Sequence, residues 1–304
     1  MNIDFLDTAT KIALHLEAMY YDFGYRKYKM NRFEPYSFYM ENENFLEDSR
    51  VITIQASSGK LLALKPDVTM SIVKNHKSYD KTKIYYNEPV FKVPAGESDF
   101  KEIQQVGLEY IGSVNINETI EVLHLAIKSL EKIGEFKFLI SDMSIVNELF
   151  SQYEISPKDR KEIIKRLKQR NMHELAEYPN VFQKLIALPA NCHSAIAQME
   201  GDSDFTPCLN RIARLKQIID DLAEVTNMDK IMFDFSNVTG TQYYNGLTFT
   251  GYIQGIASKV LSGGRYDNLL KEMGEKDKEA IGFAVYLTEI DGAKKYDKSI
   301  ITQS

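Results

Sequence analysis

The sequence has two cysteines, Cys192 and Cys208, and no tryptophan among its 304 residues. Two cysteines exclude a disulfide-dense secreted scaffold and cannot build a four-cysteine zinc site. No apolar run approaches the roughly 18 residues of a membrane span, and residues 1–4 lack the basic region that precedes a signal sequence. We therefore expect a cytoplasmic protein with no membrane partner.

An excess of positive charge is also absent, because 37 Lys and Arg stand against 43 Asp and Glu and leave a net charge of −6. This balance argues against a general nucleic-acid binder, whose affinity comes from neutralising phosphates. The five histidines show no metal-ligand spacing, so we predict no metal and no cofactor, and we assign the histidines and cysteines to the structure. The remaining composition, 44% apolar and 26% charged, is typical of a core-forming globular protein.

Hydrophobic periodicity predicts the elements of the first half of the chain. A helix capped by Asp7 should end at Gly24, and a later helix should be capped by Asn117. A hairpin is expected with strands 51–54 and 61–64, followed by a short helix opened at Lys65–Thr69, and then by strands 83–91 and 102–111.

The pattern changes from about Ser141 to Val225, where strand signals vanish. Short helices are expected there, opened by Ser156-Pro157, Leu188-Pro189 and Thr206-Pro207. Strands then return at 231–235, 242–244, 247–252 and 257–261. We predict an α+β fold with a mainly antiparallel sheet. Its domain is discontinuous, 1–140 plus 226–304, and is split by a helical insertion at 141–225.

Three short patterns are candidates for a binding site. Asn245-Gly246 predicts a tight hairpin turn, which would place Tyr243 and Tyr244 on opposite faces of one strand; the alternative is two tyrosines of a half-buried strand. Gln105 and Glu109 should face the same way on their strand, as a recognition pair or as a polar pair at a sheet edge. Asp67 is either a helix cap or an acid that binds an ammonium group.

Two further segments carry charge. Ser262–Asp267 is expected to form a tight glycine turn in which Arg265 either presents its guanidinium to a ligand or pairs with Asp267. Lys158–Arg170 holds seven basic residues. This segment is either a solvated helix face or a docking surface for an acidic partner or RNA.

A set of motifs follows the chain in order: Gly24-Tyr25, Leu64-Lys65-Pro66-Asp67-Val68-Thr69, Glu88-Pro89-Val90-Phe91-Lys92, Gln105-x-Gly107-x-Glu109, Tyr243-Tyr244-Asn245-Gly246, Gly263-Gly264-Arg265-Tyr266-Asp267 and Gly282-Phe283-Ala284-Val285. Together they resemble the catalytic domain of histidyl-tRNA synthetases. The resemblance covers most of the chain outside the helical insertion. It implies the class II synthetase fold, an antiparallel sheet flanked by helices, in a family that normally dimerises.

The departures from that family pattern concern its arginines. Lys92 stands where the family has an arginine on the ATP phosphate, and Thr239 stands where an arginine bridges the amino-acid carboxylate and the α-phosphate. Glu289 replaces the cation that closes the last motif. A Lys is not equivalent to Arg at a bidentate site, Thr supplies no charge, and Glu repels phosphate. We therefore predict that adenylate formation is lost.

The sequence also ends about 20 residues beyond Phe283, so we expect no anticodon-binding domain and no tRNA substrate. A chain with these departures resembles the regulatory subunits of ATP phosphoribosyltransferase, which act at the first step of histidine biosynthesis. The resemblance implies a non-catalytic protein that forms a hetero-oligomer with a short catalytic subunit, activates it and contributes to histidine feedback inhibition. It leaves open whether histidine binds in this chain or at an interface.

The resemblance also implies a histidine-like pocket. Its residues would be Asp67 and Thr69 at the α-amino group, Gln105, Glu109 with Tyr244 near the imidazole, Tyr243, and Arg265 in place of the lost carboxylate arginine. Two alternatives belong to other classes of protein. One is a diverged ligase that forms aminoacyl adenylates, and the other is an RNA-binding module that uses Lys158–Arg170.

Overall fold

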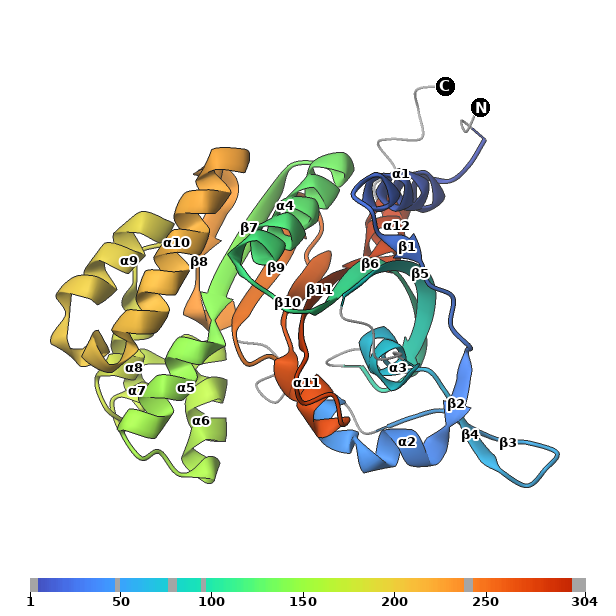
Figure 1. The fold of residues 1–304 in the computed structure, drawn as a ribbon, viewed down its shortest axis with the longest axis horizontal. Coiled ribbons are helices and arrows are strands. Elements are labelled where there is room, and N and C mark those ends of the chain that lie inside the picture. Colours follow the sequence, from blue (N-terminus) through green and yellow to red (C-terminus); the bar gives the residue numbers. More distant parts are fainter. Residues whose placement is uncertain (1–4, 47–49, 76–80, 94–96, 238–242, 297–304) are drawn as a thin grey trace.

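The computed structural model describes residues 5–46, 50–75, 81–93, 97–237 and 243–296. A central sheet of eight strands runs through the fold (Figure 1), in the order β1-β5-β6-β11-β10-β9-β7-β8. Its strands are β1 (Arg26–Lys27), β5 (Thr82–Lys92), β6 (Lys101–Gly112), β7 (Phe136–Asp142), β8 (Ile231–Phe233), β9 (Leu247–Ile253), β10 (Leu261–Arg265) and β11 (Glu279–Tyr286). Only the outer pairs β1–β5 and β7–β8 are parallel. The mainly antiparallel sheet predicted from the sequence is therefore confirmed.

A second sheet of three short strands has the order β2-β4-β3, with β2 (Phe33–Pro35), β3 (Thr53–Gln55) and β4 (Leu61–Leu64). The β3–β4 pair is the predicted hairpin, turned at Gly59, which has a φ of +80°. The first strand begins two residues later than expected.

Helices cover both faces of the central sheet. The helices α1 (Thr8–Asp22), α4 (Ile116–Ile133) and α12 (Leu287–Tyr296) pack on one face, and α2 (Tyr36–Glu41), α3 (Val68–Asn75) and α11 (Asp267–Glu272) lie on the other. The carboxylate of Asp7 accepts a hydrogen bond from the backbone N of Thr10 at 2.8 Å, which confirms the predicted cap of α1. The cap of α4 is Asn115 and not Asn117, because the side chain of Glu118 bonds the backbone N of Asn115.

The chain between β7 and β8 is helical, as expected. It contains α5 (Met143–Gln152), α6 (Pro157–Lys168), α7 (Met172–Leu175), α8 (Val181–Ala187), α9 (Cys192–Gly201) and α10 (Leu209–Val225). The described 3₁₀ turns are η1 (Glu43–Phe45), η2 (Ser203–Cys208), η3 (Met228–Lys230) and η4 (Phe235–Asn237).

Two of the predicted helix starts in this segment are misplaced. Ser156 caps α6 as expected. Asn191, and not Leu188-Pro189, opens α9, because its side chain accepts from the backbone N of Ser194 at 3.0 Å. Pro207 lies inside η2, and α10 begins after it. At α9 the side chain of Asn191, two residues after Pro189, satisfies a free backbone N–H group of the first turn, whereas α10 has no side-chain cap and continues from η2.

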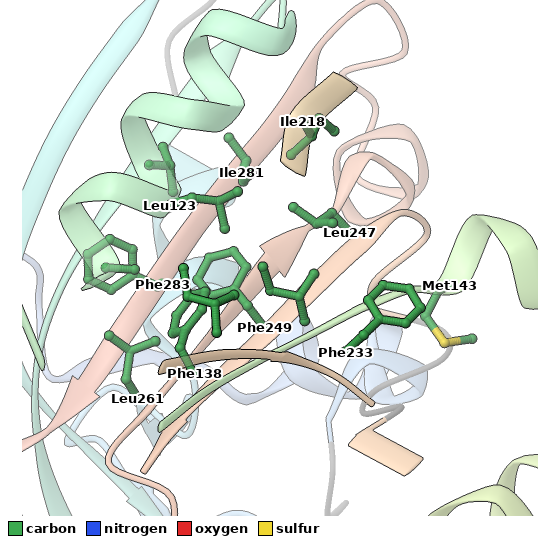
Figure 2. Packing of buried hydrophobic residues seen from close by; sticks show 14 of the residues in the cluster. Leu123, Phe138, Met143, Ile218, Phe233, Leu247, Phe249, Leu261, Ile281 and Phe283 are labelled. Atoms are coloured by element: carbon green, nitrogen blue, oxygen red, sulfur yellow. The ribbon is translucent and has the colours of Figure 1, made fainter. Parts of the chain in front are cut away.

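The hydrophobic core on the α1 and α4 face continues into the helical segment. Figure 2 shows Phe138, Phe249 and Phe283 from three strands packed together, with ring centroids 5.4 Å apart between the first two and 6.4 Å between the last two. Ile218 of α10 and Met143 of α5 belong to the same buried cluster. The helical segment therefore shares a core with the sheet. The division at residues 140 and 225 stays a prediction, and β7, which sequence patterning does not indicate, crosses the first boundary.

Candidate functional site

A buried carboxyl group lies in the middle of β6, on the face covered by α3 and α11. Glu109 is only 2% exposed. The hydroxyl of Thr69 donates to its Oε1 at 2.7 Å, and the hydroxyl of Tyr266 donates to its Oε2, also at 2.7 Å. Gln105, 6% exposed, is placed on the same face by strand alternation. The structure thus brings together two predicted residues, Thr69 and Glu109, and adds Tyr266, while Gln105 lies on the same face about 13 Å along the strand.

Burial raises the pKa of Glu109 to about 8, against the lowering effect of its two hydrogen bonds. The negative charge of Asp67 raises that pKa further. Among the described residues, no Lys, Arg or His forms an ion pair with Glu109. Glu109 therefore holds a proton at neutral pH for most of the time. In that state it can donate a hydrogen bond to a ring nitrogen, and after losing the proton it can pair with a cation.

Two glycines make room for these groups. A β-carbon at Gly282, which is paired with Glu109 across the β6–β11 ladder, would overlap Oε2 of that carboxyl group. A β-carbon at Gly107 would lie 2.5 Å from the hydroxyl of Tyr86, a fully buried side chain on β5. The small residues are needed here because polar side chains of neighbouring strands cross over them.

The two tyrosines after the helical segment reach the same site, but not in the predicted way. Residues 243–244 are not a strand, and neither Asn245 nor Gly246 has a positive φ, so the hairpin prediction is wrong. The side chain of Asn245 accepts from the backbone N of Asp267 at 3.1 Å, and this bond replaces the tight turn.

Tyr243 and Tyr244 consequently lie together rather than on opposite faces. Their ring centroids are 5.0 Å apart, and the ring of Tyr243 is 5.9 Å from that of Tyr266. The Tyr243 hydroxyl is 3.5 Å from Oδ1 of Asp67. Asp67 also accepts from the backbone N of Met70 at 2.7 Å, so it caps α3 while it faces the site. Both predicted roles of Asp67 therefore remain open to it.

Arg265 lies apart from this group. The segment Leu261–Arg265 is strand β10 and not a glycine turn. Its glycines make room for neighbouring side chains, since a β-carbon at Gly264 would lie 2.8 Å from Cδ1 of Tyr244. Gly264 pairs with Gly282 in the β10–β11 ladder, and Gly282 pairs with Glu109 in the β11–β6 ladder. Gly264 and Glu109 therefore lie on the same face of the sheet, and strand alternation places Arg265 on the opposite face.

The guanidinium of Arg265 is held by groups of the protein itself. It bonds Asp267 at 2.8 Å and the backbone O of Val114 at 3.1 Å, and it pairs with Glu279. The geometry supports the Arg265–Asp267 ion pair and does not bring Arg265 to the pocket.

Two of the three positions with departures from the family pattern lie in the described part of the fold, on separate elements. Lys92 ends β5, opposite Lys101 of β6. Glu289 lies in the first turn of α12, where its carboxylate accepts a hydrogen bond from Ser258. Thr239 lies outside the described residues.

Among the described residues no group of His, Cys, Asp and Glu could hold a metal ion, and no helix is long and apolar enough to span a membrane.

The candidate site thus consists of Glu109, Thr69 and Asp67, with the rings of Tyr243, Tyr244 and Tyr266 beside them. Gln105 shares the face of the strand but not these contacts. Sequence reasoning quoted Tyr266 in a motif but did not assign it to the site. Local spacing carries no signal for it, because only the sheet order β6-β11-β10 brings Tyr266 to Glu109. Tyr86 gives no such signal, because only the three-dimensional crossing over Gly107 brings it close.

A mainly antiparallel sheet with helices on both faces and a buried polar group on β6 is the architecture of a catalytic domain of the class II aminoacyl-tRNA synthetase type. Solved structures with this fold include an ATP phosphoribosyltransferase regulatory subunit/histidyl-tRNA synthetase from Bacillus halodurans, at a TM-score of 0.81 and 22% identity, with 96% of this chain and 81% of that chain covered. A histidyl-tRNA synthetase from Nostoc has a TM-score of 0.76 at 15% identity, with 99% and 77% covered.

The chain belongs to the histidyl-tRNA synthetase family, whose pattern it matches over residues 4–290. Among curated relatives it is 25% identical over 311 residues to an ATP phosphoribosyltransferase regulatory subunit from Oceanobacillus iheyensis, with 94% of this chain and 74% of the relative covered. A relative of the same name from Clostridium kluyveri is 26% identical, with 92% and 75% covered. A HisG:HisZ complex of ATP phosphoribosyl transferase from Thermotoga maritima has the same fold, at a TM-score of 0.73 and 18% identity, with 93% and 98% covered.

Proposed function

We propose that this protein is the regulatory subunit of an ATP phosphoribosyltransferase, in the first step of histidine biosynthesis. It binds a short catalytic subunit in a cytoplasmic hetero-oligomer, activates that subunit and contributes to histidine feedback inhibition. One contrast supports this most directly. The hydrogen-bonded group of Glu109, Thr69 and Tyr266 is formed, whereas Glu289 is an acidic residue where the synthetase pattern has a cation.

The pocket suits a small ligand that carries both an imidazole and an ammonium group. Glu109, protonated near neutral pH, can donate to an imidazole nitrogen, while Asp67 attracts an α-amino group. The hydroxyl of Thr69, two residues after Asp67, donates to Glu109. The rings of Tyr243 and Tyr244 supply flat apolar surface beside these polar groups. Histidine is the ligand that this set of groups fits.

The same chain is poorly equipped for adenylate formation. Each charge-assisted phosphate contact is worth about 1.5–3 kcal/mol, and phosphoryl chemistry depends mostly on such positioning. Lys92, Thr239 and Glu289 each weaken or remove one contact. We therefore propose that synthetase activity is lost and that tRNA is not a substrate.

Self-association as a dimer is part of this proposal. One face of the small sheet is apolar, because Leu62 is aligned with both Pro35 and Ile54, and Leu64 with Phe33. Phe33 is 45% exposed and Ile54 is 43% exposed. Covering this face with the same face of a second copy would bury these side chains. Sedimentation of the Phe33→Asp variant should then give a monomer.

The deciding experiment mixes the purified chain with a short catalytic subunit. We expect the two to co-purify, phosphoribosyl transfer to rise when this chain is added, and histidine to inhibit the pair. A Glu109→Gln variant should still assemble but should respond less to histidine. If the wild-type chain neither associates with the catalytic subunit nor stimulates transfer, the proposed function is wrong.

A further inference from the structure

Helix α6 carries four lysines on one face: Lys158, Lys161, Lys165 and Lys168, which we name the α6 lysine face. Their spacing of three, four and three residues places them within about 80° of the helix circumference. All four are exposed, whereas Ile163, Ile164 and Leu167 on the other side of α6 are buried. Figure 1 shows α6 at the lower end of the helical segment, away from α1 and α12.

The arginines and the lysines between residues 158 and 170 differ in their partners. Arg166 pairs with Glu162 at 3.2 Å and with Glu174 at 2.5 Å, and Arg170 pairs with Asp234 at 3.0 Å. None of the four lysines forms an ion pair in the part of the chain that the structure describes. Arg160 has no carboxylate partner among these ion pairs, and its guanidinium bonds the backbone O of Ile155 and lies over the ring of Phe150. All three arginines therefore contact groups of the protein itself, and the lysine face is left as a compact positive surface on a protein of net charge −6.

This arrangement is unfavourable for the isolated helix. Lys158–Lys161, Lys161–Lys165 and Lys165–Lys168 are like-charge neighbours at helical contact spacing, which destabilises a helix rather than stabilising it. Lys158 also lies in the first turn, at the positive end of the helix dipole. Carboxylates from another molecule would relieve both effects.

We propose that the α6 lysine face is a docking surface for an acidic surface of the short catalytic subunit. This inference rests on the proposed function. The face is about 15 Å long, at 1.5 Å per residue, and fits an acidic helix or strip with carboxylates at matching intervals. No aromatic side chain lies among the four lysine positions, so the base stacking that single-stranded RNA needs is not supplied. The chemistry therefore favours a protein partner over a nucleic acid.

Charge reversal tests the proposal with a full-length double variant, Lys161→Glu with Lys165→Glu. The matched control is Lys132→Glu with Lys137→Glu, which changes the net charge equally at two exposed lysines outside α6. Affinity for the catalytic subunit is measured at low and high salt, and circular dichroism with thermal unfolding checks that each variant is folded. A Lys161→Gln, Lys165→Gln variant, without reversed charge, covers the case in which the first does not fold.

We expect binding to weaken by about tenfold or more at low salt for the reversed variant, mainly through slower association, and the difference to narrow as salt screens the charges. The control should bind like the wild type. If the reversed variant binds as the wild type does, the docking inference is wrong while the proposed function stands. If the wild type does not bind the catalytic subunit, both are wrong.

Two other results would also overturn the inference. One is that reversal abolishes binding to a transfer RNA probe but leaves subunit assembly unchanged. The other is that reversal changes self-association alone, as measured by sedimentation, which would assign the face to a second copy of this chain.

Discussion

The hydroxyl of Tyr266 donates a hydrogen bond to Oε2 of Glu109 at 2.7 Å, and both side chains are buried. Tyr266 follows the end of β10, while Glu109 lies in the middle of β6, so the bond spans the intervening strand β11. The hydroxyl has to pass Gly282, where any side chain would fill the gap. The candidate site therefore depends on three neighbouring strands, β6, β11 and β10.

Glu109 should make the stability of the protein depend on pH. Its pKa is about 8 in the folded protein, against 4.5 ordinarily, so between these pH values the folded state keeps a proton that the unfolded state has released. The free energy of unfolding therefore falls as pH rises from about 5 to 8. At about 1.4 kcal/mol per pKa unit, the loss amounts to several kcal/mol.

The measurement is urea unfolding of the wild type and Glu109→Gln across this pH range. The Gln variant lacks the titrating group, so its free energy of unfolding should decline less as pH rises. The free energy of unfolding of Glu109→Gln should therefore increase relative to that of the wild type. Tyr266→Phe is the control, because it keeps the carboxyl group and should keep the decline. Parallel curves for the wild type and Glu109→Gln would rule out a protonated Glu109.

Gly282→Ala should damage the pocket more than an ordinary substitution of this size. The added methyl group would overlap Glu109 Oε2 and the backbone O of Leu108, and neither can move without breaking the β6–β11 ladder or the Tyr266 hydrogen bond. Overpacking of this kind costs about 1–3 kcal/mol or more.

Gly201→Ala provides the matched control for that substitution. Nothing lies within 4 Å of a β-carbon at Gly201, and the residue ends helix α9. Alanine there should leave stability unchanged or raise it by up to about 1 kcal/mol. The free energy of unfolding of both variants is measured in denaturant. Equal changes at the two positions would mean that Gly282 is not crowded.

The elements with strong local signals were predictable from the sequence. Asp7 caps α1 and Ser156 caps α6 because both use neighbouring residues alone. The predicted glycine turn at 262–267 is wrong because its glycines make room for side chains that are distant in the sequence: a β-carbon at Gly264 would lie 2.8 Å from Tyr244, and one at Gly263 would lie 2.5 Å from Phe283. The Asn245-Gly246 hairpin failed because a long-range bond to Asp267 overrides the turn preference.

The candidate site was predictable in part for the same reason. Gln105 and Glu109 share one strand, so alternation alone places them on one face. Tyr266 and the two tyrosines at 243–244 join them only through sheet order, which local spacing does not contain. Arg265 was assigned from residue type, and register places it on the opposite face of the sheet.

Arg170 offers a test of backbone strain in the helical segment. Its φ is +51°, in the left-handed region that favours glycine, and it directly follows Gln169 at the end of α6. Its guanidinium bonds Asp234 at 3.0 Å and the backbone O of Ile186 at 3.1 Å, ties that offset the strain.

Replacing Arg170 by Ala removes these bonds and keeps the strain, whereas Gly removes both. We expect Arg170→Gly to be more stable than Arg170→Ala by about 1 kcal/mol in urea unfolding. Asp234→Asn should weaken only the bond between the Arg170 guanidinium and residue 234, and it serves as the control. A Gly variant no more stable than the Ala variant would contradict a strained backbone at this position.

Histidine-dependent pyrophosphate exchange separates a regulatory subunit from a diverged ligase. Lys92, Thr239 and Glu289 together forfeit roughly 5–9 kcal/mol of phosphate stabilisation, which corresponds to a loss of about 10⁴–10⁷ in rate. We expect no exchange above background by the isolated chain, measured beside an active histidyl-tRNA synthetase. Glu289→Arg alone should not restore exchange, because the other two positions remain unfavourable and the Ser258 contact is lost. Clear exchange by the wild type would instead establish a ligase, since adenylate would then form despite the anion at Glu289.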